Sequence, residues 1–206
     1  MNQDTLRGRA LVDAVIAHVT APASRVHVAS PQPLDAGEIA ALEAKAGVTL
    51  PPSFRAWLAF DVSLLSRRYG WKLDRGLPVK PVTEVVGAHA GVFLESFQPV
   101  LDKFLPGMAL QLDAGSDSMR FLYFGAADPD GELPVLFIDH DDTPIIGVAW
   151  PGFDVWLAVK TGLLSWKSRA YAGLSSEVSR RVFGSPDAID TTDLMIEATS
   201  SDMDDD

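Results

Sequence analysis

Apolar residues recur at helical spacing near the start of the chain. Leu11, Val12, Val15 and Val19 fall on one face of a 3.6-residue period, which predicts an amphipathic helix over residues 5–19. Similar spacing predicts further helices, and proline and glycine divide them from one another. These further helices are expected over residues 35–46, from residue 52 onward, and over residues 82–90, 93–105, 153–164 and 174–183.

Helix boundaries are best marked around the second helix. Asp35 is a good N-cap, and Glu38 follows three places later, as in a capping box. Gly47 favours the left-handed turn that ends a helix. The segment Leu50-Pro51-Pro52 is expected to open the third helix, because proline is tolerated at a first helical position. Phe54 is expected in the buried stripe of this helix.

Short apolar and aromatic segments separated by Asp, Gly and Pro follow in the second half. They predict four strands, over 108–112, 120–124, 135–138 and 145–150. Consecutive strands joined by short turns form an antiparallel meander. The predicted class is therefore α+β, with an antiparallel sheet of about four to six strands and helices packed on one face.

The first twenty residues superficially resemble a signal peptide, because Arg7 and Arg9 precede an apolar stretch. Asp13 and His18 interrupt that stretch, however. The pattern favours an amphipathic helix of the mature protein. No apolar run approaches the ~20 residues that span a bilayer, so no membrane segment is expected.

Composition and charge narrow the class of protein. The chain has 206 residues, of which 47% are hydrophobic, enough for one domain over residues 1–186. The absence of cysteine fits a reducing cytoplasm and excludes disulfides and thiolate metal sites. Eight of the 28 acidic residues fall in 187–206, predicted to be a mobile tail that either maintains solubility or steers a partner. No basic face that could bind nucleic acid is expected. A monomer is the favoured oligomeric state.

Two acidic turns contain residues that could take part in metal binding or catalysis. Asp128, Asp130 and Glu132 surround Gly131, but their spacing is not that of a calcium loop, and Asp-Pro-Asp-Gly is typical of a β-turn. The run from Asp139 through His140 and Asp141 to Asp142 could hold a metal or an acid–base pair. Successive side chains rarely converge on one ion, so we expect an exposed acidic loop, with no catalytic, cofactor-binding or metal site.

A basic and aromatic segment lies between the third and fourth predicted helices. Tyr69 and Trp71 stand among arginine and lysine residues in 67–72. Trp, Tyr and Arg dominate protein-binding hot spots, which makes Tyr69 and Trp71 candidates for partner contact. Packing of this loop on the core is the alternative.

Two ordered patches resemble the SUKH superfamily, which includes Smi/Knr-type regulators and many bacterial immunity proteins. The first combines Leu42-Glu43, Gly47, Leu50-Pro51 and Trp57-Leu58. The second joins the strand ending at Val148-Ala149-Trp150 to a helix reading Phe153-Asp154-Val155-Trp156-Leu157, with Gly152 where serine is commoner. The resemblance covers residues 34–164. Asp61-Val62 stands where the family often has Asn-Gly, and residues 67–106 form a longer stretch.

The resemblance implies a cytoplasmic bacterial immunity protein that is not an enzyme and needs no cofactor. Such a protein binds a cognate toxin, for example a nuclease, and occludes its active site. A regulatory scaffold of the Smi/Knr type and an enzyme with an unrecognised site are the alternatives. The expected partner-binding residues are Asp128, Asp130, Glu132, Asp139, Asp141, Asp142, Tyr69 and Trp71.

Overall fold

A computed structural model of the chain describes residues 6–65, 76–141 and 143–191. The chain divides into two compact units, each assembled from three segments. The first unit contains Met1–Pro78, Ala127–Pro134 and Trp150–Gly173. The second contains Val79–Ala126, Val135–Ala149 and Leu174–Asp206. The sequence predicted one domain over residues 1–186, and within that range the structure has these two interleaved units.

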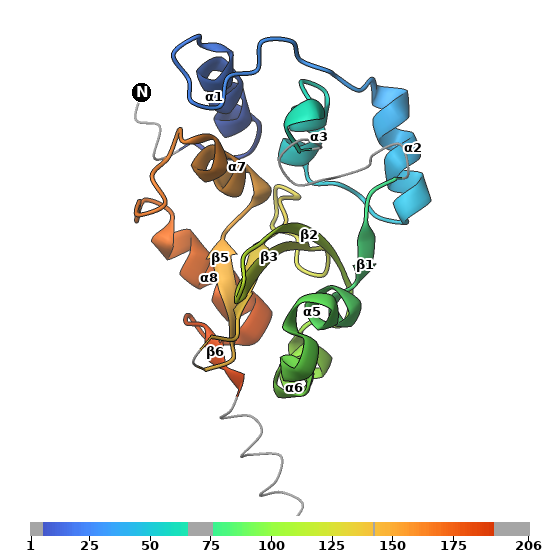
Figure 1. The fold of residues 1–206 in the computed structure, drawn as a ribbon, viewed down its shortest axis with the longest axis vertical. Coiled ribbons are helices and arrows are strands. Elements are labelled where there is room, and N and C mark those ends of the chain that lie inside the picture. Colours follow the sequence, from blue (N-terminus) through green and yellow to red (C-terminus); the bar gives the residue numbers. More distant parts are fainter. Residues whose placement is uncertain (1–5, 66–75, 142, 192–206) are drawn as a thin grey trace, which may run out of the picture. The chain divides into compact units, whose positions relative to one another are not determined.

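The first unit is built from helices. They are α1 (Gly8–Thr20), α2 (Ala36–Ala46), α3 (Pro52–Leu58) and α7 (Phe153–Thr161). α1 packs against α3 and α7, as Figure 1 shows. The apolar stripe predicted for α1 is fully buried in this contact, at Leu11, Val12, Val15 and Val19. Its helical spacing therefore identified the packed face correctly.

The caps of α2 are those predicted. The Asp35 carboxylate accepts a 2.8 Å hydrogen bond from the Glu38 backbone, and the Glu38 carboxylate accepts one of 2.8 Å from the Asp35 backbone. Gly47 ends the helix at φ 67°, in the left-handed region that favours glycine. A short polar side chain and a glycine thus satisfy both ends of the helix.

α3 begins at Pro52, within the Leu50-Pro51-Pro52 segment predicted to open it, and buries large aromatic side chains. The rings of Phe54 and Phe153 stack with centroids 4.2 Å apart, which joins α3 to α7. Trp57 and Trp156 are fully buried in the same unit. Each of these aromatic side chains removes a large apolar area from water.

The second unit contains an antiparallel sheet. Its order is β1 (Val79–Pro81), β2 (Met108–Ala114), β3 (Ser118–Tyr123), β4 (Val135–Asp139), β5 (Ile145–Trp150) and β6 (Ile189–Asp190). The four predicted strands correspond to β2–β5, and the meander is confirmed. β1 and β6 were not predicted. β6 pairs with β5 inside the segment expected to be a mobile tail, while residues 192–206 lie outside the described part.

Helices of the second unit cover one face of this sheet. They are α5 (Val82–Ala90), the short 3₁₀ helix η3 (Gly91–Phe93), α6 (Leu94–Phe104) and α8 (Ala172–Phe183). Met119, Phe121 and Tyr123 alternate along β3 and share one buried cluster with apolar residues of these helices. Alternation places them on the same face, so the predicted α+β arrangement is confirmed. The helical members of the cluster include Val82, Val85, Val86, Phe97, Val100, Leu101 and Phe183.

Among the described residues, no helix is long and apolar enough to cross a membrane.

Candidate partner-binding surfaces

The acidic turn at residues 128–132 belongs to the first unit and is a β-turn, as predicted. The Gly131 backbone N–H donates to the Asp128 carbonyl at 2.9 Å, and Gly131 has φ 79°. Asp128 Oδ1 accepts from the backbone N–H groups of Asp130 and Glu132, at 2.9 and 2.8 Å. These bonds fix the conformation of the turn and leave the Asp130 side chain exposed.

Glu132 is buried, so the prediction that its side chain forms part of an exposed partner-binding surface is wrong. It is only 2% exposed. Its Oε1 accepts from the Ser53 backbone N–H at 2.9 Å, and its Oε2 accepts from the Ser53 hydroxyl at 2.5 Å. Burial raises the pKa of Glu132 to about 7, against the opposing effect of the Ser53 bonds. The carboxyl group is therefore part of the interior, bound at the first turn of α3.

Asp128 is close to a buried ion pair that sequence reasoning missed. Arg7 Nε donates to Asp154 Oδ2 at 2.8 Å, and the Gly8 backbone N–H donates to the same oxygen at 2.6 Å. Asp154 is fully buried at the start of α7, where a carboxylate is stabilised by the helix dipole. Arg7 Nη2 also lies 3.7 Å from Asp128 Oδ2, which offsets the negative charge of Asp128.

The second predicted acidic turn connects β4 to β5 in the second unit. Asp139 Oδ1 accepts a 3.1 Å hydrogen bond from the Asp141 backbone N–H. The Asp141 side chain is exposed, and Asp139 is half-buried. Within the described ranges, neither forms an ion pair with lysine or arginine. Asp142, Tyr69 and Trp71 lie outside the described residues, so their predicted roles stay predictions.

His140, at the end of β4, is surrounded by aromatic rings. The Phe93 ring stacks on it at a centroid distance of 5.0 Å and an interplanar angle of 16°. The His89 ring lies 5.3 Å away. The His140 backbone N–H donates to the Asp117 carbonyl at 3.0 Å. Burial lowers the pKa of His89 and the neighbouring His140 lowers it further, while Asp117 has the opposite effect.

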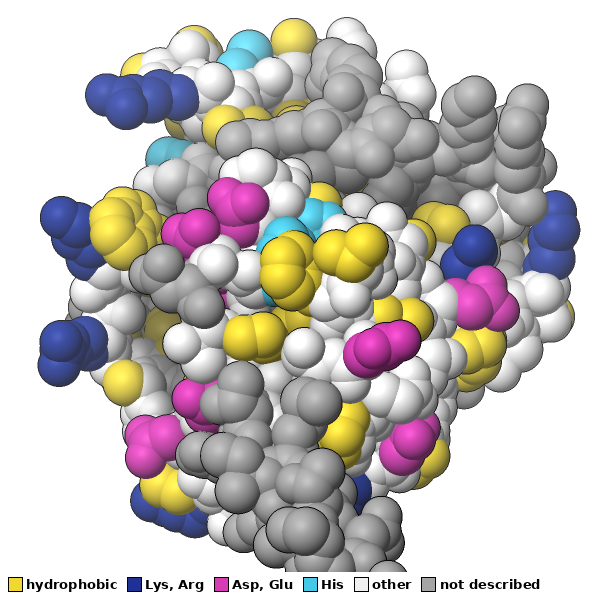
Figure 2. All heavy atoms as spheres, turned by 60° about the horizontal axis from the view of Figure 1, so that its bottom comes forward, with side chains coloured by type: hydrophobic (Ala, Val, Ile, Leu, Met, Phe, Trp, Pro, Cys, Tyr) yellow, Lys and Arg dark blue, Asp and Glu magenta, His cyan; other side chains and the backbone are white. Residues whose placement is uncertain are grey.

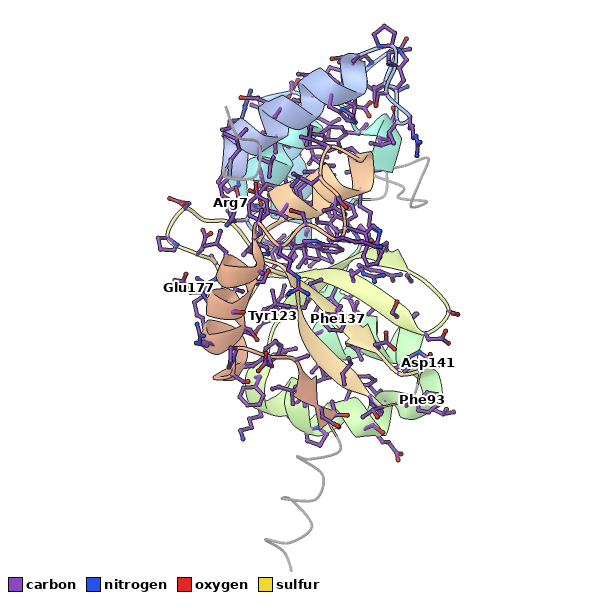
Figure 3. All side chains as sticks on the ribbon, turned by 90° about the vertical axis from the view of Figure 1, so that its left-hand side faces the viewer. Arg7, Phe93, Tyr123, Phe137, Asp141 and Glu177 are labelled. Carbon is purple, nitrogen blue, oxygen red and sulfur yellow. The ribbon has the colours of Figure 1, made fainter. Side chains whose placement is uncertain are left out.

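Val92 and Phe93 are exposed beside this histidine, and sequence reasoning did not select them. Val92 is 89% exposed and Phe93 42%. Figure 2 shows hydrophobic side chains next to histidine on this face, and Figure 3 places Phe93 and Asp141 at the same edge. Gly91 before two large apolar residues was the available signal, but the same pattern occurs in buried turns.

The described residues contain no group of three or more His, Asp or Glu side chains suited to a metal ion. The exposed side chains of Asp130 and Asp141 offer negative charge and hydrogen-bond acceptors. The two turns belong to different units.

Comparison with known proteins assigns no family. No family model matches the chain, and no curated protein matches it. One solved structure with similarity is an uncharacterized protein from Salmonella enterica subsp. enterica serovar typhimurium str. 14028s. It is 16% identical, with a TM-score of 0.48 over 90% of this chain and 98% of the other. Similarity at this level carries no conclusion about function.

Proposed function

We propose that this chain is a cytoplasmic protein-binding module, and specifically a SUKH-like immunity protein that occludes a bacterial toxin. The family assignment rests on the two sequence patches in residues 34–60 and 148–157. The proposal contains no catalytic step, cofactor or metal. Binding alone is the activity.

The observation that carries the proposal is a set of carboxylates available to a partner. Asp130 and Asp141 are exposed and Asp139 is half-buried, and none of them has a cationic partner in the described part of the chain. In these turns the Asp128 carboxylate accepts a hydrogen bond from the Asp130 backbone N–H, and the Asp139 carboxylate accepts one from the Asp141 backbone N–H. A partner that binds Asp130 would therefore lose little free energy in ordering the turn at residues 128–132.

The charge of these turns defines the expected mechanism. A toxin that acts on nucleic acid has a basic substrate cleft, which negative turns attract and orient. Docking over such a cleft excludes the substrate. Because the attraction acts between exposed charges, it weakens as salt screens them.

The decisive experiment is a toxin-protection assay combined with capture of partners from a lysate of the protein's own organism. A triple variant, Asp130→Lys, Asp139→Lys and Asp141→Lys, should bind the captured toxin at least about tenfold more weakly at low salt. The matched control, Asp102→Lys, Glu177→Lys and Asp187→Lys, changes the net charge equally at other exposed positions. It should keep its affinity.

Equal loss of affinity in both variants would show that only net charge matters, and unchanged affinity in the first would remove these turns from the interface. A partner that is a regulator of the same cell, captured without any protection against a toxin, would favour the scaffold role. Turnover of a small substrate by the purified protein would contradict the proposal altogether.

A further inference from the structure

Two adjacent apolar side chains stand out on the second unit. Val92 and Phe93 are consecutive, and both are exposed, at 89% and 42%. Burial of such exposed side chains against a partner is favourable, because it removes apolar surface from water. Exposed apolar side chains mark interaction sites where they form a contiguous patch with a polar rim.

The local backbone presents these two residues in a defined conformation. α5 ends at Gly91, whose φ of 54° favours glycine, and η3 passes directly into α6 at Leu94. Stacking on His140 fixes one face of the Phe93 ring. Two helices and a ring contact therefore order the pair before any partner arrives, which lowers the entropic cost of binding.

The polar groups beside the pair are acidic or neutral. Asp139 and Asp141 flank His140 in the chain, and Asp117 accepts a backbone hydrogen bond from His140. Burial lowers the pKa of His89, which disfavours a positive charge on this side chain beside the carboxylates. Most basic side chains of this unit have contacts elsewhere: Lys80 with Glu84, Lys103 with the Phe104 ring, Arg120 with Asp113, and Arg181 with the Ala126 carbonyl.

From these observations we infer that Val92, Phe93, His140, Asp139 and Asp141 form one docking patch, the Val92–Phe93 patch. It fits a protein partner that presents an apolar contact site bordered by lysine or arginine. The apolar centre requires apolar contact, and the acidic rim disfavours acidic proteins and nucleic acids by repulsion. The inference rests on the proposed function for the existence of a protein partner, and it adds the surface and the partner's chemistry.

The test uses the full-length ¹⁵N-labelled protein and three short amidated peptides. The first alternates lysine with leucine and tryptophan, the second replaces the apolar residues by serine, and the third replaces lysine by glutamate. At low salt, the first peptide should shift the amide signals of Val92, Phe93 and His140. The serine peptide should bind at least about tenfold more weakly than the first peptide, and the glutamate peptide should not bind.

Variants distinguish this patch from general attraction to acidic residues. Val92→Ser and Phe93→Ser should each weaken binding of the first peptide several-fold, and together about tenfold or more. Leu174→Ser changes another exposed apolar side chain, 38% exposed in α8, and should leave binding unchanged. Equal affinity of the double variant and the wild-type protein, or signal shifts confined to other regions, would overturn the inference.

The proposed function and this inference fail in different ways. A toxin that binds the Val92→Ser, Phe93→Ser variant as tightly as the wild-type protein would support immunity and reject the patch. Peptide binding at the patch, with no protection against any toxin, would support the patch and reject immunity.

Discussion

The carboxyl group of Glu132 and residue Ser53 lie 79 positions apart in the sequence and bind each other through two hydrogen bonds. Both the backbone N–H and the hydroxyl of Ser53 donate to this carboxyl group, at 2.9 and 2.5 Å. The pair joins the turn at residues 128–132 to the first turn of α3. A residue expected to contact a partner thus holds the first unit together.

The Glu132 pair predicts a pH-dependent stability. The folded-state pKa of about 7 lies above the ordinary value of 4.5. The folded protein therefore binds more protons than the unfolded chain between these values, and this contribution to stability decreases as pH rises from about 4.5 through 7. Each unit of pKa shift corresponds to about 1.4 kcal/mol, so the decrease is on the order of 3–4 kcal/mol.

Glu132→Gln should remove most of that decrease, because an amide can accept from the Ser53 N–H and donate to its hydroxyl without becoming charged. Urea unfolding between pH 4.5 and 8 measures the effect. The wild-type protein and the variant should have similar stability near pH 4.5, and the variant should be more stable at pH 8. Asp130→Asn, at an exposed carboxylate of the same turn, is the control. Parallel curves for the wild-type protein and Glu132→Gln would contradict the assignment.

Because Arg7 pairs with the buried Asp154, replacing Arg7 should reduce folding stability much more than replacing its neighbour Arg9. Arg7→Met would leave the fully buried Asp154 carboxylate without its cation and should destabilise folding by about 2–4 kcal/mol. Arg9→Met removes only the exposed pair with Asp13 and should change stability by less than about 0.5 kcal/mol. Chemical denaturation of both variants makes the comparison.

Adding Asp154→Asn to Arg7→Met should recover part of the lost stability, because the uncompensated charge is then removed. A double variant whose losses simply add would show that the two side chains act independently. Equal effects of Arg7→Met and Arg9→Met would show that the Arg7 pair is no stronger than a surface pair.

The backbone conformations of two glycines predict opposite changes in stability when each glycine is replaced by alanine. Gly91 has φ 54°, so Gly91→Ala should destabilise the protein by about 1–2 kcal/mol and alter the Val92–Phe93 patch. Gly173 lies within α8 at negative φ with open space around a Cβ atom, so Gly173→Ala should stabilise by up to about 1 kcal/mol. Thermal unfolding of the two variants tests this. Stabilisation by Gly91→Ala would show that the turn adopts another conformation.

Local physical chemistry made several elements predictable. Asp35, Glu38 and Gly47 act on backbone groups within a few residues, so their pattern determines both ends of α2. The same holds for the β-turn at Asp128–Gly131 and for the strands β2–β5, where alternation and turn residues are neighbours in the chain. β1 and β6, with three and two residues, are too short to give a periodic signal.

Tertiary structure alone decided which acidic residues are buried and which apolar ones are exposed. Asp130 and Glu132 are both acidic residues of one turn, yet one is exposed and the other faces Ser53. Arg7 and Asp154 contact each other although they are 147 positions apart in the sequence. Phe93, which lies between α5 and α6, stacks on His140, which follows the end of β4. Residue type and spacing describe what a side chain offers, whereas burial depends on the distant segment that covers it.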